Sequence, residues 1–183
     1  VPSAEATKQY LYDTFFSNQY YNFANVGRYK YNKKLSLANR IAGQIASEDV
    51  KLGDKLFVSQ GEEISKEVAE EIQNSGINQV RIIFNDKPLK IIGNARVKLS
   101  KVFPCNEEEL GIEELVYYPL LSKILEENKT NEERLDAIKA QAKELVTTHL
   151  TIDDIISCMN YLLCLDVGYG ETDNIDHLAN RRI

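Results

Sequence analysis

Apolar residues near the start of the chain recur at the spacing of an α-helix. Ser3 can accept a hydrogen bond from the first turn of such a helix. Apolar side chains then follow three and four residues apart, which predicts a helix with one buried face. The residues on that face are Ala6, Tyr10, Leu11 and Phe15.

A second helical pattern follows Thr151 near the other end. Thr151 and Asp154 have the spacing of a capping box, so we expect a helix to begin between them. The apolar stripe that follows is strong and predicts a face packed into a core rather than a cofactor site. Its members are Ile152, Ile155, Ile156, Met159, Leu162 and Leu163.

Between these helices the pattern changes to short apolar runs separated by turns. Runs at 55–58, 80–84, 89–92 and 95–99 predict strands. The segment 85–88 contains Asn, Asp and Pro, which are typical of a turn. A short helix capped by Ser65 and ended by Gly76 is expected between the first two strands.

The segment from 112 to 148 returns to helical spacing. Pro119 either begins the helix there or kinks it, because proline cannot donate the backbone hydrogen bond of a helix interior. Thr130 and Glu133 form a second capping box in front of a further helix. Helices at both ends around a β-rich middle predict an α+β fold.

The stretch from Tyr29 to Leu35 alternates tyrosine and lysine and supports two interpretations. As a strand it would have one basic face, and lysine with tyrosine can contact nucleic acid. Alternatively, the lysines extend over packed tyrosines, with their charged ends in water. We favour the second interpretation because the chain as a whole is acidic.

The charge is uneven along the 183 residues, whose net charge is −6. Residues 1–40 contain six Lys/Arg against two Asp/Glu, whereas 41–150 contain fourteen against twenty and 151–183 two against six. A protein that binds nucleic acid on its own is normally basic. Any contact with DNA must therefore be local.

Candidate catalytic and metal sites are weakly supported. Three cysteines without a Cys-x-x-Cys pair indicate neither a disulfide framework nor a zinc site and favour a reducing, cytoplasmic location. His149 and His177 have no metal-binding spacing. Asp173, Asp176 and His177 could form an acid–base cluster, but neighbours on one loop rarely converge without partners from elsewhere in the chain.

The most distinctive stretch is residues 168–183. Gly168 and Gly170 are expected to stop the preceding helix and allow positive φ angles. The pattern Gly-x-Gly-Glu-x-Asp-x-Ile-Asp-His-Leu-x-Asn-Arg-Arg that they begin resembles a signature of the bacterial DNA-directed RNA polymerase beta subunit. A second match, in order and in register, runs from Phe15 through the stretch 21–35.

This resemblance implies a nested organisation. Residues 1–40 and 149–183 would form part of the lobe domain of the beta subunit, a helical subdomain built from both ends of the chain. Residues 41–148 would be an inserted external domain, a small β-rich module similar to a barrel-sandwich hybrid plus helices. The chain begins at Val1 rather than at an initiator Met, and it stops at Arg181-Arg182-Ile183 with no residue that would cap or end a structural element. We therefore expect a piece of a longer protein.

The resemblance also implies a role. The residues matching Ile175, Asp176 and Arg181 help to form a pocket for an unpaired base of the non-template strand in the family. Chemically, a carboxylate can accept from the edge of guanine and an arginine can hold base or phosphate. This chain departs from the family pattern at two positions of the loop: Asn174 stands where the family has an acid, and Ala179 where it has glycine.

By the same resemblance, this segment is not itself catalytic, and the Mg²⁺ of the parent polymerase is held on another subunit. The implied partners are the beta-prime, alpha and omega subunits, a sigma factor and DNA, with no membrane. Two other hypotheses remain open. The chain could be a free-standing acidic adaptor that binds a basic protein, or a small hydrolase that uses His177 and an acidic residue.

Overall fold

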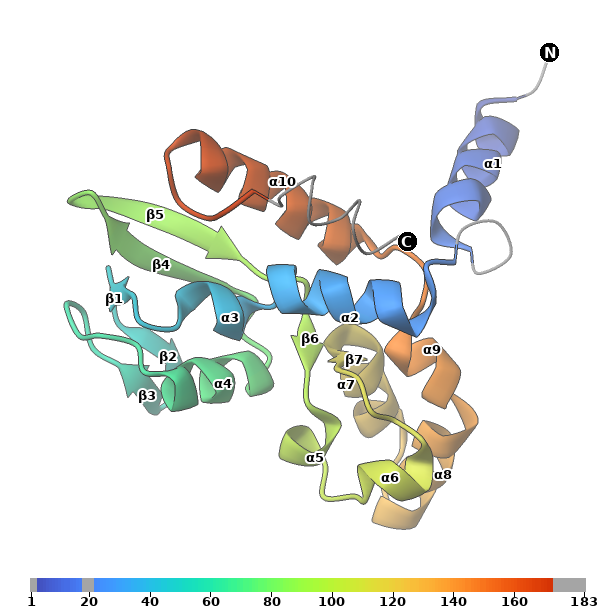
Figure 1. The fold of residues 1–183 in the computed structure, drawn as a ribbon. Helices are drawn as coiled ribbons and strands as arrows, with labels where there is room; N and C mark the ends of the chain where they lie inside the picture. The colour runs from blue at the N-terminus through green and yellow to red at the C-terminus, as the bar shows by residue number, and fades with distance from the viewer. Residues whose placement is uncertain (1–2, 18–21, 173–183) are drawn as a thin grey trace, which may run out of the picture.

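The computed structural model describes residues 3–17 and 22–172, and it confirms an α+β fold (Figure 1). Within those ranges no helix is both long and apolar enough to cross a lipid bilayer. The helices are α1 (Ala4–Phe16), α2 (Ala24–Leu35), α3 (Leu37–Ile41), α4 (Lys66–Asn74), α5 (Leu99–Val102), α6 (Glu107–Leu110), α7 (Tyr118–Glu127), α8 (Asn131–Ala140), α9 (Ala142–Val146) and α10 (Ile152–Asp166). The strands are β1 (Ile45–Ala46), β2 (Val50–Leu52), β3 (Lys55–Val58), β4 (Gln79–Phe84), β5 (Lys87–Ile92), β6 (Arg96–Val97) and β7 (Val116–Tyr117).

The first of two cores lies around an antiparallel sheet with strand order β1-β4-β5. The predicted turn joins β4 to β5, and both Asn85 and Asp86 have positive φ there, as a tight hairpin requires. Helix α3 packs against β4 and β5, α10 packs against β5, and α4 packs against α3, and all three helices contribute residues to this core. Because α3 and α10 share a core with the strands, this core contains residues on both sides of position 40.

The second core is formed mainly by helices. Residues of α5, α7, α8 and α9 pack around the short β6–β7 pair, in the module drawn at the bottom of Figure 1. Pro119 lies in the first turn of α7, so it begins the helix and does not kink it. The capping box at Thr130 is present. The predicted run 95–99 is only partly a strand, because α5 begins at Leu99.

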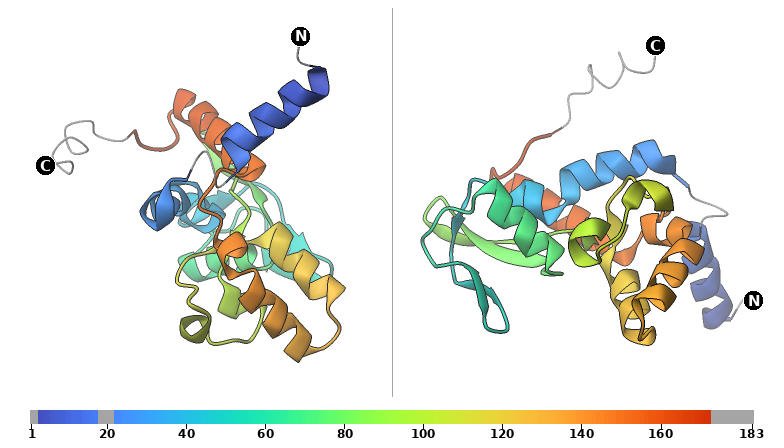
Figure 2. Two further views of the ribbon diagram at one scale, coloured as in Figure 1. Left: turned by 90° about the vertical axis from the view of Figure 1, so that its right-hand side faces the viewer. Right: turned by 90° about the horizontal axis from the view of Figure 1, so that it is seen from below.

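The interpretation of Tyr29 to Leu35 as a strand with one basic face, which we did not favour, is wrong. The segment is the second half of α2, which lies beside α10 (Figures 1 and 2). Arg28, Asn32 and Leu35 follow one another at helical spacing and are all buried. Contacts on this face select the helix over the local alternation of tyrosine and lysine, because tertiary packing overrides β-propensity.

Two predicted buried faces are also wrong within this chain. Helix α1 is capped by Ser3 as predicted, but none of its residues is buried. The apolar stripe of α10 is likewise exposed, with Leu163 at 67% and Met159 at 60% of full exposure. The division of the chain at residues 40 and 148 stays a prediction.

Gly76 provides a test of how α4 and α7 fit together. The residue ends α4 with φ +91°, and a Cβ atom there would lie 2.4 Å from the ring of Tyr118. Substitution Gly76→Ala combines backbone strain with overpacking, so we expect a loss of about 2–4 kcal/mol in the free energy of unfolding. Urea titration measures this loss.

Gly53→Ala is the matched control. Gly53 also has positive φ (+57°), but a Cβ atom added there would have nothing within 4 Å. The substitution carries only the conformational cost, about 1 kcal/mol. Equal losses in the two variants would show that the contact with Tyr118 is unimportant.

Candidate functional site

The residues predicted to hold a DNA base, Ile175, Asp176 and Arg181, lie outside the described residues, as do Asp173 and His177. The structure does describe the part of the chain that leads into their segment. This part consists of α10, the turn that follows it to Thr172, and the side chains that fix both to the rest of the chain.

The turn after α10 has the geometry predicted from its two glycines. Gly168 has φ +89°, and its N–H donates to the carbonyl of Leu165 at 2.9 Å. The N–H of Tyr169 donates to the carbonyl of Cys164 at 2.8 Å. These bonds satisfy carbonyls that the end of a helix leaves free, and they turn the chain back over α10.

Two tyrosines anchor this turn. The hydroxyl of Tyr169 donates to the backbone carbonyl of Arg40 at the end of α3. Burial raises the pKa of Tyr169 to about 12, so the hydroxyl keeps its proton at neutral pH. The hydroxyl of Tyr161 donates to the carbonyl of Glu171 at 2.7 Å. The start of the segment that carries the predicted residues is therefore tied to α3 and to α10.

Arg40 also contacts the end of α10 and the turn that follows it. Its Nη1 donates to the carbonyl of Ile92 at 2.6 Å, and its Nη2 lies 3.4 Å from Sγ of Cys164. The guanidinium stands 5.2 Å from the centre of the Tyr161 ring, which is cation–π distance. Burial lowers the pKa of Arg40, while Cys164 and the two tyrosines oppose that shift.

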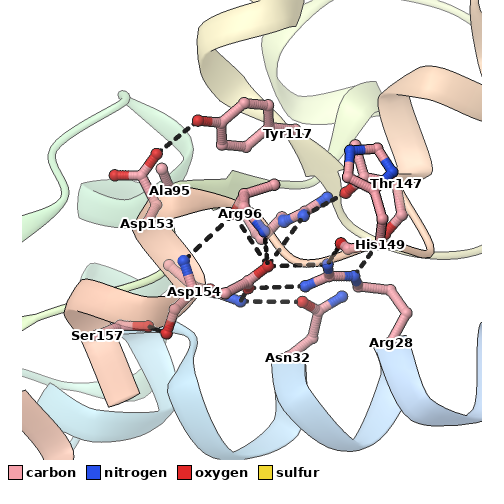
Figure 3. A network of polar contacts seen from close by, with 12 residues as sticks. Arg28, Asn32, Ala95, Arg96, Tyr117, Thr147, His149, Asp153, Asp154 and Ser157 are labelled. Carbon is pink, nitrogen blue, oxygen red and sulfur yellow. Dashed lines mark hydrogen bonds and ion pairs between the residues drawn. The ribbon is translucent and has the colours of Figure 1, made fainter. Parts of the chain in front are cut away.

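Further along α10, Asp154 is the centre of a buried polar network (Figure 3). Arg28 of α2 donates from Nη1 and Nη2 to the two carboxylate oxygens of Asp154, at 2.7 and 2.9 Å. The same guanidinium donates to the backbone carbonyls of Thr147 and His149, both at 2.8 Å. Both charged side chains are completely buried, so Arg28 and Asp154 join α2 to α10 without solvent screening.

A second arginine completes this network. Nη2 of Arg96 lies 3.7 Å from Oδ2 of Asp154, and its Nη1 donates to the carbonyl of Val146 at 3.0 Å. Asn94 donates to Oδ1 of Asp154 at 3.2 Å. The two segments that connect the second core to the rest of the chain, around residues 94–97 and 146–151, therefore both meet at Asp154.

The pKa shifts follow from burial and from two cations facing one carboxylate. Burial pushes the pKa of Asp154 upward, but the hydrogen bonds from Arg28 and the positive charges of Arg28 and Arg96 outweigh it, and the net pKa is lowered. Burial and the neighbouring charge of Arg28 lower the pKa of Arg96 to about 9, so it remains a cation at pH 7. Asp154 and Arg96 are thus held in their charged forms, an arrangement suited to fixing structure rather than to transferring protons.

The sequence pattern predicts a role for Asp154 only in the cap of α10. That part is confirmed: Thr151 and Asp154 exchange capping-box hydrogen bonds. Its partners were missed, because Arg28 and Asn94 lie 126 and 60 residues away and no local pattern links them. Within residues 3–17 and 22–172, no group of three His, Cys, Asp or Glu side chains is arranged to hold a metal ion.

The exposed side of α2 carries Tyr29, Lys30 and Lys33. Its inner side partly follows the favoured interpretation of this stretch: Lys34 lies over the ring of Tyr161 at 5.3 Å, and Tyr31 stacks on Phe23 at 5.0 Å. The helix thus uses one lysine and one tyrosine for packing and leaves a small basic and aromatic surface facing water.

Substitution Asp154→Asn removes the carboxylate and leaves two buried guanidinium groups without a counter-charge. We expect a loss of about 3–5 kcal/mol in the free energy of unfolding at pH 7, measured by urea titration. Asp136→Asn, on the exposed surface of α8, is the control and should stay within about 0.5 kcal/mol of the parent.

The same pair of proteins tests the pH dependence. The folded-state pKa of Asp154 is below its unfolded value, so its stabilisation is complete above about pH 4 and disappears as pH falls through the folded-state pKa. The difference between parent and Asp154→Asn should therefore shrink on acidification. A difference that is unchanged from pH 7 to pH 2 would contradict the assigned charge state.

Comparison with known proteins agrees with the sequence pattern. The model of the family described as RNA polymerase Rpb2, domain 2, matches residues 62–183. The chain is 44% identical over 188 residues to the DNA-directed RNA polymerase subunit beta of Caldicellulosiruptor bescii and 43% identical to that of Acetivibrio thermocellus. The corresponding subunit of Clostridium perfringens is 40% identical over 184 residues.

In each of these three comparisons the match covers 100% of this chain and 15% of the relative. The chain therefore spans about a seventh of the length of the curated relatives that it matches. The match runs through both ends and the middle, including the segment 41–148. From the family match and these identities together, the chain belongs to the RNA polymerase Rpb2 domain 2 family, as a fragment of a bacterial-type beta subunit.

Proposed function

We propose that this chain is a non-catalytic part of the DNA cleft wall of a bacterial RNA polymerase, where it helps to hold downstream and non-template DNA. Its family membership and the DNA-directed RNA polymerases among its relatives support this proposal. The observation that carries it is the doubly anchored turn at Tyr169 and Glu171. These two hydrogen bonds fix where the following segment begins, and a short segment can bind a base only if its side chains are held in position.

In this proposal Ile175 packs against an unpaired base, Asp176 accepts hydrogen bonds from its edge, and Arg181 holds base or phosphate. The exposed lysines of α2 supply a local basic surface on a chain that is otherwise acidic. The segment works as a positioning surface, while bond formation and its Mg²⁺ belong to another subunit.

The proposed partners are the other polymerase subunits, beta-prime, alpha and omega, together with a sigma factor and DNA. The whole enzyme would act in the cytoplasm. The alternative of a free-standing acidic adaptor finds no support among the relatives, which are named as polymerase subunits.

The isolated chain should not bind DNA with micromolar affinity at about 150 mM salt. One good bidentate base contact contributes about 1–3 kcal/mol, whereas a micromolar complex requires about 8 kcal/mol. The net charge of −6 opposes binding further. Fluorescence anisotropy with a labelled DNA fork measures this. Micromolar binding would mean that the chain holds a complete DNA site of its own.

In the complete enzyme, Asp176→Ala and Arg181→Ala should each shorten the lifetime of promoter complexes or alter sequence-dependent pausing. The expected change is about 5- to 150-fold in lifetime, the equivalent of one lost base contact. Nucleotide addition on a preformed scaffold should continue. Filter binding with a competitor and single-round transcription provide the two measurements.

Asp166→Ala and Arg81→Ala are matched controls, since both residues are exposed and lie outside the proposed pocket. They should leave lifetime and pausing unchanged. Loss of all nucleotide addition in an assembled Asp176→Ala or Arg181→Ala enzyme would instead indicate a catalytic role for this segment.

A further inference from the structure

Helix α10 has an inverted distribution of side chains. Its buried side carries the polar residues Asp154 and Ser157 together with Cys164. The side that faces water carries six large apolar residues, which follow one another at helical spacing as one stripe. We call these residues the α10 stripe: Ile152, Ile155, Ile156, Met159, Leu162 and Leu163.

This stripe is too large to be an ordinary exposed surface. Single apolar side chains are common on protein surfaces, but a contiguous row along a helix of 15 residues, about 22 Å, is not. No Lys or Arg occurs anywhere in α10. A helix face that is meant for water usually carries such residues, so the composition indicates a face that is covered in the working protein.

Helix α1 gives separate evidence that apolar surfaces of this chain are covered in the working protein. It has 13 residues, none of them buried, and it exposes Tyr10, Leu11, Tyr12 and Phe15. An isolated helix of that length is marginal in water, so it needs a surface to pack against. Figures 1 and 2 (left) draw α1 and α10 at the end of the molecule away from α5 and α8.

We propose that the α10 stripe is a permanent docking surface for another part of the same beta-subunit polypeptide, one that presents an apolar face. The match to relatives of which this chain spans only 15% supports that occupant, because most of such a subunit lies outside this chain. Apolar interfaces without charge are typical of permanent contacts rather than transient ones.

The α10 stripe lies on the side of α10 opposite the contacts that join this helix to the rest of the chain. One side of α10 is held by Arg28 and Asp154, and its end starts the segment with Asp176. A docked partner on the opposite side would fix α10 from both faces. The inference rests on the proposed function for its setting, but it concerns assembly alone, so its test needs no DNA.

Met159 is the only methionine of this chain and makes the test direct, because it is 60% exposed within the stripe. Hydrogen peroxide converts an accessible methionine to its sulfoxide. The rate is followed by mass spectrometry of the Met159 peptide, in the isolated chain and in the complete beta subunit. We expect oxidation at least tenfold slower in the complete subunit. Equal rates would overturn the proposal.

A double variant gives the second measurement. Met159→Gln with Leu163→Gln should leave the thermal midpoint of the isolated chain within about 2 °C, because both side chains are exposed there. In the complete subunit it should lower the midpoint by several degrees and speed limited proteolysis at least tenfold. Leu52→Gln with Leu56→Gln, two leucines each 52% exposed on the β2–β3 hairpin, is the matched control.

Two outcomes would overturn the proposal, the first by changing the occupant and the second by removing the interface. If the isolated chain sediments as a dimer that the stripe variant dissociates, while the complete subunit is unaffected, a second copy covers the stripe. If the double variant harms neither protein, the stripe is not an interface. Unchanged promoter-complex lifetimes in Asp176→Ala would reject the proposed function without affecting these results.

Discussion

The carboxylate of Asp154, held between two buried arginines, is the interaction on which the rest of the structure depends. It connects four segments that are distant in sequence: α2, the chain around Asn94 and Arg96, the chain around Thr147, and α10 itself. A buried ion pair adds little net stability when complete, but losing one partner is costly. Its importance here is therefore orientation, since it fixes how the second core and α10 are placed relative to α2.

Helix α10 extends from Asp154 to a second group of contacts at its other end. The buried side of the helix ends at Cys164, where Arg40 and the two anchoring tyrosines hold the following turn. The next residues are those proposed to contact DNA. Helix α10 is therefore held at both ends, by the ion pair of Arg28 with Asp154 at its start and by the contacts of Arg40, Tyr161 and Tyr169 at its end, where the proposed DNA-binding segment begins.

Local features of this fold could be predicted from the sequence. The caps at Ser65, Thr130 and Thr151, the hairpin at Asn85 and the helix stop at Gly168 depend on residues within a few positions of each other. The α+β class followed from the same short-range patterns. The segment with Ile175, Asp176 and Arg181 was identified by its motif, and its role stays a prediction because those residues lie outside the described ranges.

Long-range features could not be predicted. The helical state of α2 depends on Arg28 finding Asp154 and on Leu35 being buried, and neither is visible in the alternation of tyrosine and lysine. The exposed stripe of α10 has a related cause: periodicity identifies an apolar face but not the surface that covers it. Apolar periodicity therefore predicted the helix correctly and its surroundings incorrectly.

The central claim is that this chain holds the non-template strand, and site-specific crosslinking tests it most directly. A photo-reactive phenylalanine analogue would replace Ile175 in the complete polymerase, with the same analogue at Leu56 as a control on an exposed hairpin. On a promoter with differently labelled strands, the account predicts a crosslink from position 175 to the non-template strand and none from position 56. A crosslink to the template strand alone, or no crosslink in an active enzyme, would contradict it.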